Sequence, residues 1–200
     1  MQDTIIDLLR HGEPEGGRRY RGHNIDDPLT EKGWSQMWQA VGDFKQWDHI
    51  VSSPLQRCTA FANALAEKHN IPVSVEDNLK EVGFGTWEGK TPDELKQANV
   101  EEFDAFYADP VNNRPEGAEP LQSFFDRVSS AFKQITEIYA GKHCLLIAHA
   151  GVNRAIIANA IEASAAGMYR IDVKNAGLSR IKVTEKGMKL MFHNYTSLPE

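Results

Sequence analysis

The stretch CLLIAH, Cys144 to His149, is a continuous apolar run that stops abruptly at an imidazole. A run of this kind is typical of a strand covered on both faces, as in parallel sheets that lie between two layers of helices. The segment from Val152 to Ile161 then has a helical pattern. A buried strand followed at once by a helix indicates an α/β fold.

The rest of the chain alternates between strands and helices in the same way. Thr4 to Leu9, His49 to Val51 and Pro72 to Val75 are the other early strand candidates. Helical patterns are expected to begin at Thr30, at Ser53 with Pro54 as the first helical residue, at Thr91 and at Leu121. Residues 178–194 predict two strands joined by a turn around Lys186-Gly187. We therefore expect a three-layer α/β/α sandwich with a mostly parallel central sheet and an antiparallel edge.

Length and composition point to one globular domain. The chain has 200 residues, of which 41% are hydrophobic and 25% charged. We expect residues 1–200 to form a single domain in which residues 90–117 are a small helical cap insertion. Cys58 and Cys144 lie in apolar contexts without metal-type spacing, so both are predicted to be buried and free.

The charge of the chain limits its partners. A net charge of -6 argues against a nucleic acid or an anionic membrane surface as a partner. No stretch of the sequence approaches the ~20 apolar residues that span a bilayer, and the N-terminus lacks the pattern of a signal peptide. We expect a cytoplasmic protein whose partner is a small molecule. A homodimer is compatible with the sequence, which does not determine the oligomeric state.

Basic or imidazole side chains follow three of the predicted strands. Arg10 and His11 end the first, Arg57 lies in the first helical turn after the second, and His149 follows CLLIAH. Ligands of open α/β sheets bind beyond the carboxyl ends of the strands, so these four side chains are expected to converge. Two guanidiniums, two imidazoles and nearby helix N-termini suit a dianion such as phosphate. Taken singly, each residue could equally be a solvated strand boundary.

An imidazole in such a site can attack phosphorus and form a covalent phosphohistidine. His11 is the better candidate for this role, because Gly12 lets the backbone turn tightly beside it. Glu81, in the glycine-rich segment EVGFGTWEG, is the expected proton donor to the leaving oxygen and the base for water. Three other glutamates remain alternatives for the acid: Glu13, Glu88 and Glu119. The sequence has no HExxH and no P-loop lysine motif, so we expect neither a metal nor a cofactor.

Four segments of the chain resemble, in order, the motifs of the histidine phosphatase superfamily, also called the phosphoglycerate mutase-like fold. They are LLRHGE at 8–13, SSPLQR at 52–57, EVGFGTWEG at 81–89 and IAHAGVNR at 147–154. The resemblance covers nearly the whole chain. It implies that His11 is the phosphorylated nucleophile and Glu81 the proton donor. It implies phosphate binding by three further residues: Arg10, Arg57 and His149.

Within the superfamily, residues 19–37 look most like α-ribazole phosphatases. This resemblance implies a metal-independent phosphomonoesterase that hydrolyses α-ribazole 5′-phosphate in cobalamin (adenosylcobalamin) biosynthesis. The alternatives are a phosphatase of broad specificity or for sugar phosphates, a phosphoglycerate-type mutase, and a non-catalytic binder of a phosphorylated ligand. Accumulation of free phosphate during turnover would separate a phosphatase from a mutase.

Two positions depart from the family pattern. Gly17 stands where the family commonly has an asparagine that helps to bind phosphate, so a backbone N–H of Gly16 or Gly17 either replaces it or the contact is lost. Gly17, Arg21 and Gly22 are the expected substrate contacts of this region. In the second departure, Ala118-Glu119-Pro120 replaces the usual Gly-Glu-Ser ahead of the long helix.

Other aromatic, basic and histidine side chains have two readings each. An aromatic wall for a flat ligand is one reading of Tyr20, Phe103, Phe106 and Tyr107, and packing of the cap is the other. Phe84 and Trp87 could stack on a ligand, but they are predicted to be core residues. Arg18, Arg19 and Arg21 could contact the far end of the substrate, but the favoured interpretation is a basic surface loop. Five histidines without evident partners are predicted to be surface or packing residues: His23, His49, His69, His143 and His193.

Overall fold

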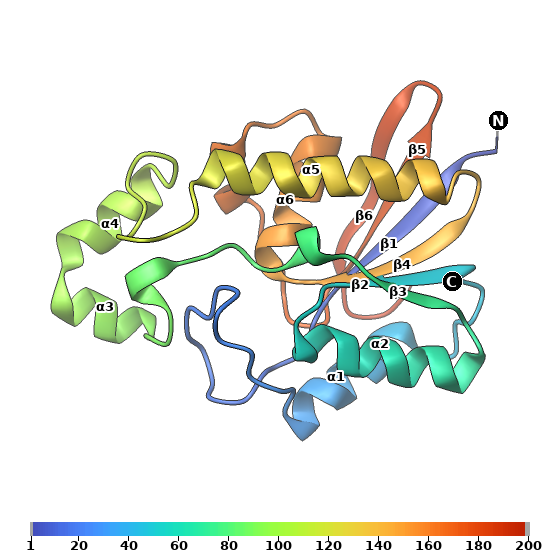
Figure 1. The fold of residues 1–200 in the computed structure, drawn as a ribbon, viewed down its shortest axis with the longest axis horizontal. Coiled ribbons are helices and arrows are strands. Elements are labelled where there is room, and N and C mark those ends of the chain that lie inside the picture. The colour runs from blue at the N-terminus through green and yellow to red at the C-terminus, as the bar shows by residue number, and fades with distance from the viewer. Residues whose placement is uncertain (1, 199–200) are drawn as a thin grey trace.

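A six-stranded sheet forms the centre of the computed structural model, which describes residues 2–198 (Figure 1). The strands are β1 (Thr4–Arg10), β2 (His49–Ser52), β3 (Val73–Val75), β4 (His143–Ala148), β5 (Leu178–Thr184) and β6 (Gly187–Tyr195). Their order is β3-β2-β4-β1-β5-β6. The first four are parallel to one another, and β5 and β6 add an antiparallel edge. The predicted mixed sheet is therefore confirmed.

Helices cover both faces of this sheet, which confirms the three-layer arrangement. The helices are α1 (Glu31–Val41), α2 (Gln56–His69), α3 (Pro92–Ala98), α4 (Val100–Ala108), α5 (Leu121–Ile138) and α6 (Ala150–Ala160). One core lies between the sheet and α1 with α2, and the other lies between the sheet and α5 with α6. Figure 1 shows α5 above the strands and α1 and α2 below them. Within residues 2–198, no helix has the length and apolar character needed to cross a bilayer.

The apolar run of β4 is explained by burial on two sides. Leu145 and Ile147 face the core under α1 and α2, whereas Leu146 and Ala148 face the core under α5 and α6. Since successive side chains of a strand point to opposite faces, a strand covered on both sides must be apolar at every position. Cys58 and Cys144 are buried and free, as predicted.

Asp7 of strand β1 is a charged residue that is completely buried. Its carboxylate accepts hydrogen bonds from His143 Nε2 at 2.8 Å, Arg180 Nε at 2.7 Å and Trp47 Nε1 at 2.9 Å. Burial alone would raise the pKa of Asp7, but the bonds from His143 and Arg180 outweigh it and the pKa lies below its usual value. The prediction that His143 lacks a partner was therefore wrong, because the partner lies far away in the sequence.

The start of α2 also differs from the prediction. The helix begins at Gln56, after Leu55, and not at Pro54. Ser53 Oγ accepts a long hydrogen bond from the Leu55 N–H at 3.4 Å, and it lies 2.6 Å from His149 Nε2. The contact with His149 holds Ser53 in the loop between β2 and α2, so the helix starts two residues later.

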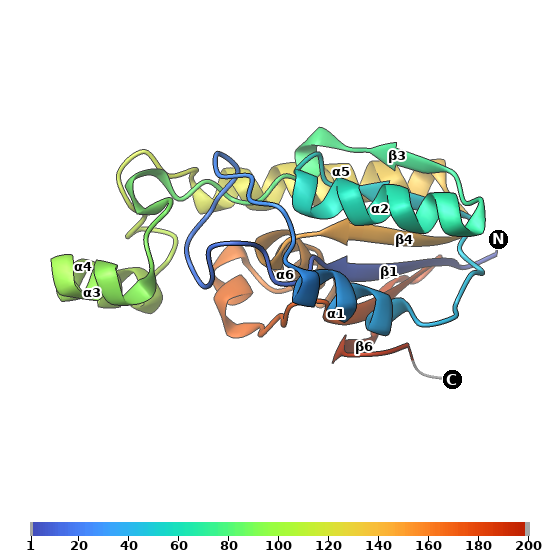
Figure 2. The ribbon, with the colours of Figure 1, turned by 90° about the horizontal axis from the view of Figure 1, so that it is seen from below.

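Residues 90–117 contain α3 and α4, which project beyond one end of the sheet (Figures 1 and 2). A capping box between Thr91 and Glu94 begins α3, as its sequence predicts. We call α3 and α4 the cap. Its small core joins Leu95, Phe103 and Phe106 to Trp87 of the preceding segment. The cap therefore packs against the loop that carries Glu81.

Candidate active site

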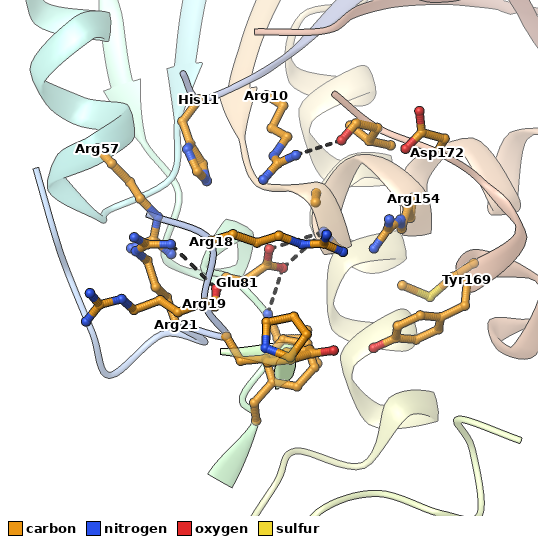
Figure 3. Close-up of a pocket in the computed structure, with 18 of the residues that line it drawn as sticks. Arg10, His11, Arg18, Arg19, Arg21, Arg57, Glu81, Arg154, Tyr169 and Asp172 are labelled. Atoms are coloured by element: carbon orange, nitrogen blue, oxygen red, sulfur yellow. Dashed lines mark hydrogen bonds between the residues drawn. The ribbon is translucent and has the colours of Figure 1, made fainter. Parts of the chain in front are cut away.

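A cavity of about 290 Å³ lies between the carboxyl ends of the parallel strands and the cap (Figure 3). Arg10, His11, Arg57 and Glu81 all line it, although they come from distant parts of the chain. The convergence predicted from the strand ends is thus observed at the cavity for Arg10, His11 and Arg57, whereas His149, the fourth residue of that prediction, does not line it. Arg10 and His11 follow β1, Arg57 lies in the first turn of α2, and Glu81 lies in the segment after β3.

His11 is held in one tautomer. Its Nδ1 lies 2.8 Å from the carbonyl oxygen of Gly12. A carbonyl can only accept a hydrogen bond, so Nδ1 carries the hydrogen and Nε2 keeps its lone pair. Burial, together with the guanidiniums of Arg10 and Arg57, holds the pKa of His11 well below its usual value. The ring is therefore neutral near neutral pH, with a free nitrogen available as a nucleophile.

Gly12 is required here by close packing. A Cβ atom at this position would lie 2.1 Å from the carbonyl oxygen of Gly33 in α1. Gly12 does not adopt a positive φ, so the predicted tight turn is not the reason for the glycine. Its backbone approaches α1 so closely that no side chain fits between them.

Arg10 and Arg57 are fixed by backbone carbonyl groups. Arg10 donates to the carbonyl of Val173 at 2.7 Å, while its buried Nε has no hydrogen-bond partner in the part of the chain that the structure describes. Burial lowers the pKa of Arg10 to about 10, which still leaves the group charged at neutral pH. Arg57 donates to the carbonyls of Ile25 at 2.9 Å and of Gly22 at 3.0 Å. Both guanidiniums are thus oriented before any ligand arrives.

His149 lies beside His11 and behind the wall of the cavity. The centroids of the two rings are 5.2 Å apart, and His149 is completely buried. Burial, with Arg57 and His11 nearby, holds the pKa of His149 well below its usual value. The hydroxyl of Ser53 lies 2.6 Å from Nε2 of His149, although the sequence predicts that Ser53 caps a helix.

The carboxylate of Glu81 lies against the start of α6. It accepts hydrogen bonds from the backbone N–H of Gly151 at 3.1 Å and of Val82 at 3.0 Å. The three alternative acids are engaged away from the cavity, where Glu13 pairs with Lys32, Glu88 accepts from Phe84 N–H, and Glu119 pairs with Arg127. None of the three lines the cavity, whereas Glu81 does. The position of Glu81 fits the predicted acid.

The segment 16–22 places arginines rather than glycine N–H groups at the cavity. Arg21 is only 8% exposed and donates to the carboxylate of Asp27 at 2.8 Å and to the carbonyl of Gly17 at 2.8 Å. Gly17 and Gly22 do not appear among the residues that line the cavity; their carbonyls hold Arg21 and Arg57 instead. Arg18 and Arg19 also line it, so this segment is not simply a basic surface loop.

Three further residues with charged or hydroxyl-bearing side chains line the cavity and were not predicted from the sequence. They are Arg154 of α6, Tyr169 and Asp172 (Figure 3). Arg154 Nε donates to the carbonyl of Ile171 at 2.8 Å, and its guanidinium lies over the ring of Tyr169. The signal for Arg154 was present, because it ends the segment IAHAGVNR one turn into a helix that begins at the strand end.

The predicted aromatic wall is only partly present. Tyr20 and Tyr107 line the cavity, and their hydroxyl oxygens lie 2.5 Å apart, which joins segment 16–22 to the cap. Phe103 and Phe106 instead pack inside the cap. Phe84, predicted to be a core residue, lines the cavity as well.

The cavity is strongly cationic although the chain as a whole is acidic. Six arginines and two carboxylates line it, and they are Arg10, Arg18, Arg19, Arg21, Arg57, Arg154, Glu81 and Asp172. Local positive charge of this kind attracts and orients a dianion. Within residues 2–198 there is no group of three or more His, Cys, Asp or Glu side chains that could hold a metal ion.

The cationic cavity at the strand ends, with a neutral histidine at its base, defines a site for a phosphate ester. The family model of the histidine phosphatase superfamily (branch 1) matches residues 6–196, and the chain belongs to this superfamily. Among curated relatives, a bifunctional protein of Mycobacterium tuberculosis is 33% identical over 84% of the chain. The chain spans only 47% of the length of that relative.

Other relatives match over more of their length. Adenosylcobalamin/alpha-ribazole phosphatase of Salmonella typhimurium is 29% identical, over 83% of this chain and 84% of its own. Phosphoserine phosphatase 1 of Hydrogenobacter thermophilus is 29% identical over 74% of this chain and 72% of its own. The crystal structure of the alpha-ribazole phosphatase from Shigella flexneri superposes with a TM-score of 0.84 at 27% identity, covering 98% of both chains. These relatives differ in their substrates.

Proposed function

We propose that the protein is a phosphomonoesterase that works through a phosphohistidine at His11. One observation carries this proposal: the hydrogen bond from Nδ1 to Gly12 leaves the lone pair of Nε2 free in a cavity lined by arginines. A neutral imidazole can attack phosphorus, and positive charge around it stabilises the phosphoryl group as it is transferred. Arg10 and Arg57 supply that charge from fixed positions.

In the first step, His11 Nε2 attacks phosphorus and the bond from phosphorus to the ester oxygen breaks. The carboxyl group of Glu81 gives its proton to the departing oxygen, so the product leaves as a neutral alcohol. Arg10 and Arg57 hold the oxygens of the phosphoryl group. His149, 5.2 Å from His11 between ring centroids, is proposed to support the same group from behind.

In the second step, a water molecule attacks the phosphorus of phosphohistidine. The carboxylate of Glu81 takes a proton from this water, and the bond between phosphorus and Nε2 breaks. Inorganic phosphate leaves, and His11 returns to its neutral form with the hydrogen on Nδ1. Glu81 is again protonated, which completes the cycle.

For the substrate, we propose α-ribazole 5′-phosphate as the first candidate. The similarity to α-ribazole phosphatases over most of the chain supports this choice. Aromatic side chains at the cavity, those of Tyr20, Phe84 and Tyr107, offer surfaces on which a flat ring system can pack. The cobalamin pathway is part of this proposal. The phosphoserine phosphatase among the relatives makes phosphoserine the first compound for comparison.

The chemistry is tested with a generic aryl phosphate in the presence of a chelator. Wild type is expected to release phosphate under these conditions, because arginines supply the positive charge of the site. His11→Ala is expected to lose this activity, while His69→Ala, at the C-terminal end of α2, keeps it. An inactive wild type, or equal activity in His11→Ala, would overturn the mechanism.

The substrate is tested with a panel that includes α-ribazole 5′-phosphate, phosphoserine and sugar phosphates. We expect α-ribazole 5′-phosphate to give the highest kcat/KM. A higher kcat/KM for another ester would make that ester the preferred substrate and would leave the proposed mechanism unchanged. Free phosphate should accumulate in step with turnover, and its absence would indicate a mutase.

A further inference from the structure

The segment that carries Glu81 is held from behind by one side chain of α5. Arg127 Nη1 donates to the carbonyl of Asn78 at 2.6 Å and to that of Lys80 at 3.0 Å, and Nη2 donates to that of Glu81 at 3.3 Å. Three carbonyls of one short segment therefore converge on a single guanidinium. This fixes the backbone of the segment through a residue that does not itself line the cavity.

Glu119 completes this arrangement. Its carboxylate accepts from Arg127 Nε at 2.7 Å and from Nη2 at 2.9 Å, which is the paired geometry that arginine and carboxylate favour. The same carboxylate accepts from the backbone N–H of Gly83 at 3.2 Å. Arg127 and Glu119 thus hold the chain on both sides of Glu81, and each is only 17% exposed.

Arg114 holds the same segment from the cap side. It donates to the carbonyls of Gly83 at 2.8 Å and of Glu119 at 3.1 Å, and its guanidinium lies over the ring of Phe84. On the other side of the segment, the carboxylate of Glu81 meets the N–H of Gly151 in α6. The backbone is therefore anchored in several places while the carboxyl group remains at the cavity wall.

We propose that the Arg127–Glu119 pair is a positioning device that aims the carboxyl group of Glu81 at the leaving oxygen of the substrate. Neither residue lines the cavity, so both act through Glu81 and do not touch the substrate. This assigns a role to Glu119, which matches only part of its family motif in the sequence. The inference rests on the proposed phosphatase function, in which Glu81 is the proton donor.

The test compares two esters that differ in their need for an acid. An alkyl phosphate such as glycerol phosphate needs a proton on its leaving oxygen, whereas 2,4-dinitrophenyl phosphate does not. kcat/KM reports the step in which this group leaves. For Arg127→Met, we expect kcat/KM of the alkyl ester to fall by about 10- to 100-fold, which is part of the roughly 10²–10⁴-fold that a general acid contributes. We expect kcat/KM of the dinitrophenyl ester to fall by less than about 3-fold.

Two further variants make the test specific. In Glu81→Gln, adding Arg127→Met should cause no additional loss on the alkyl ester, because both changes disable one function. Lys133→Met is the matched control, since it removes an exposed cation and an ion pair from the same helix without touching the Glu81 segment. Lys133→Met should leave kcat/KM unchanged for both esters.

An equal loss on both esters would show a merely structural role and would overturn the inference, as would no loss on either. If Arg127→Met does not fold, Glu119→Gln is used, which keeps the shape and removes the charge; the same selective loss is expected. Failure of the proposed function looks different, because wild type would then hydrolyse neither ester or His11→Ala would hydrolyse both.

Discussion

The two ends of the cavity are built in different ways. At the reaction end, His11 and Arg57 are buried, belong to a strand end and a helix start, and are fixed by backbone groups. At the cap end, Tyr20 and Tyr107 come from a loop and from α4, and Tyr107 is 46% exposed. In the proposed mechanism, the core of the fold therefore supplies the reacting groups, while peripheral segments shape the space for the leaving group.

This difference follows from how each end is anchored. The N–H of His11 donates to the carbonyl of Ala148 at 2.9 Å, so the proposed nucleophile continues the hydrogen bonding of β1 with β4. The cap instead relies on its own small core around Phe106. A change at His11 or at a phosphate-binding arginine should therefore lower the activity on every substrate equally, and a change in the cap should lower the activity on some substrates more than on others.

The largest effect is expected from Arg57→Ala. Removing a fixed donor from a transition-state site typically lowers the rate by about 10²–10³-fold, and kcat/KM should fall by this factor for all phosphate esters alike. Arg57→Lys should restore little, because lysine lacks the planar fork that grips two oxygens. If the loss of kcat/KM in Arg57→Ala depended on the leaving group of the ester, the proposed difference between the two ends would be wrong.

A second prediction concerns pH. The pKa of His11 lies well below about 6.5, chiefly through burial and then through Arg10 and Arg57, so the neutral nucleophile persists as the pH falls. The acid limb of kcat/KM should lie below pH ~6.5 in wild type. Arg10→Gln removes one nearby positive charge, which raises the pKa of His11 and moves this limb upward. A limb unchanged by Arg10→Gln would contradict the electrostatic part of this account.

At the cap end, Phe106→Ala should lower the stability of the cap by about 3–5 kcal/mol, the usual range for a buried Phe. Phe106 is completely buried between Trp87 and Tyr169, so the cavity wall should loosen. Proteolysis within residues 90–117 should accelerate. Activity on a small aryl phosphate should change far less than activity on a larger ester. Equal changes in both activities would contradict the proposed difference between the two ends.

The smallest effect is expected from Tyr20→Phe. This change removes the hydroxyl contact with Tyr107 that joins segment 16–22 to the cap. A hydrogen bond of this kind contributes about 1 kcal/mol, so KM for an extended substrate should rise by roughly 5-fold while kcat stays within about 2-fold. Steady-state kinetics on two esters of different size measure this, and a large loss of kcat would place Tyr20 in the chemistry instead.

The reaction end could be predicted from the sequence because its signals are local. Apolar runs locate strand ends, and parallel strands bring Arg10, His11 and Arg57 to one edge. Asp172 and Tyr169 could not be found in this way, since they reach the cavity only through the packing of the chain after α6. Asp7 was missed for a similar reason: its partners, His143 and Arg180, are more than a hundred residues away.

The glycines of segment 16–22 were also placed only in part by the sequence. Gly17 and Gly22 were expected to contact the substrate, but their carbonyls hold arginines that do line the cavity. A sequence pattern indicates where the backbone can turn, whereas the direction of each carbonyl depends on neighbouring segments. Gly12 is a second case, because a side chain at this position would clash with the backbone of Gly33 in α1, which is distant in the sequence.

Trapping of the phosphorylated protein tests the central claim most directly. Wild type is mixed with a radiolabelled phosphate ester, quenched, and treated with acid or with base before the labelled peptide is identified. We predict a label that is lost in acid, survives base, lies on the peptide containing His11 and is absent from His11→Ala. An acid-stable label, or one that persists in His11→Ala, would contradict the account and indicate a different nucleophile.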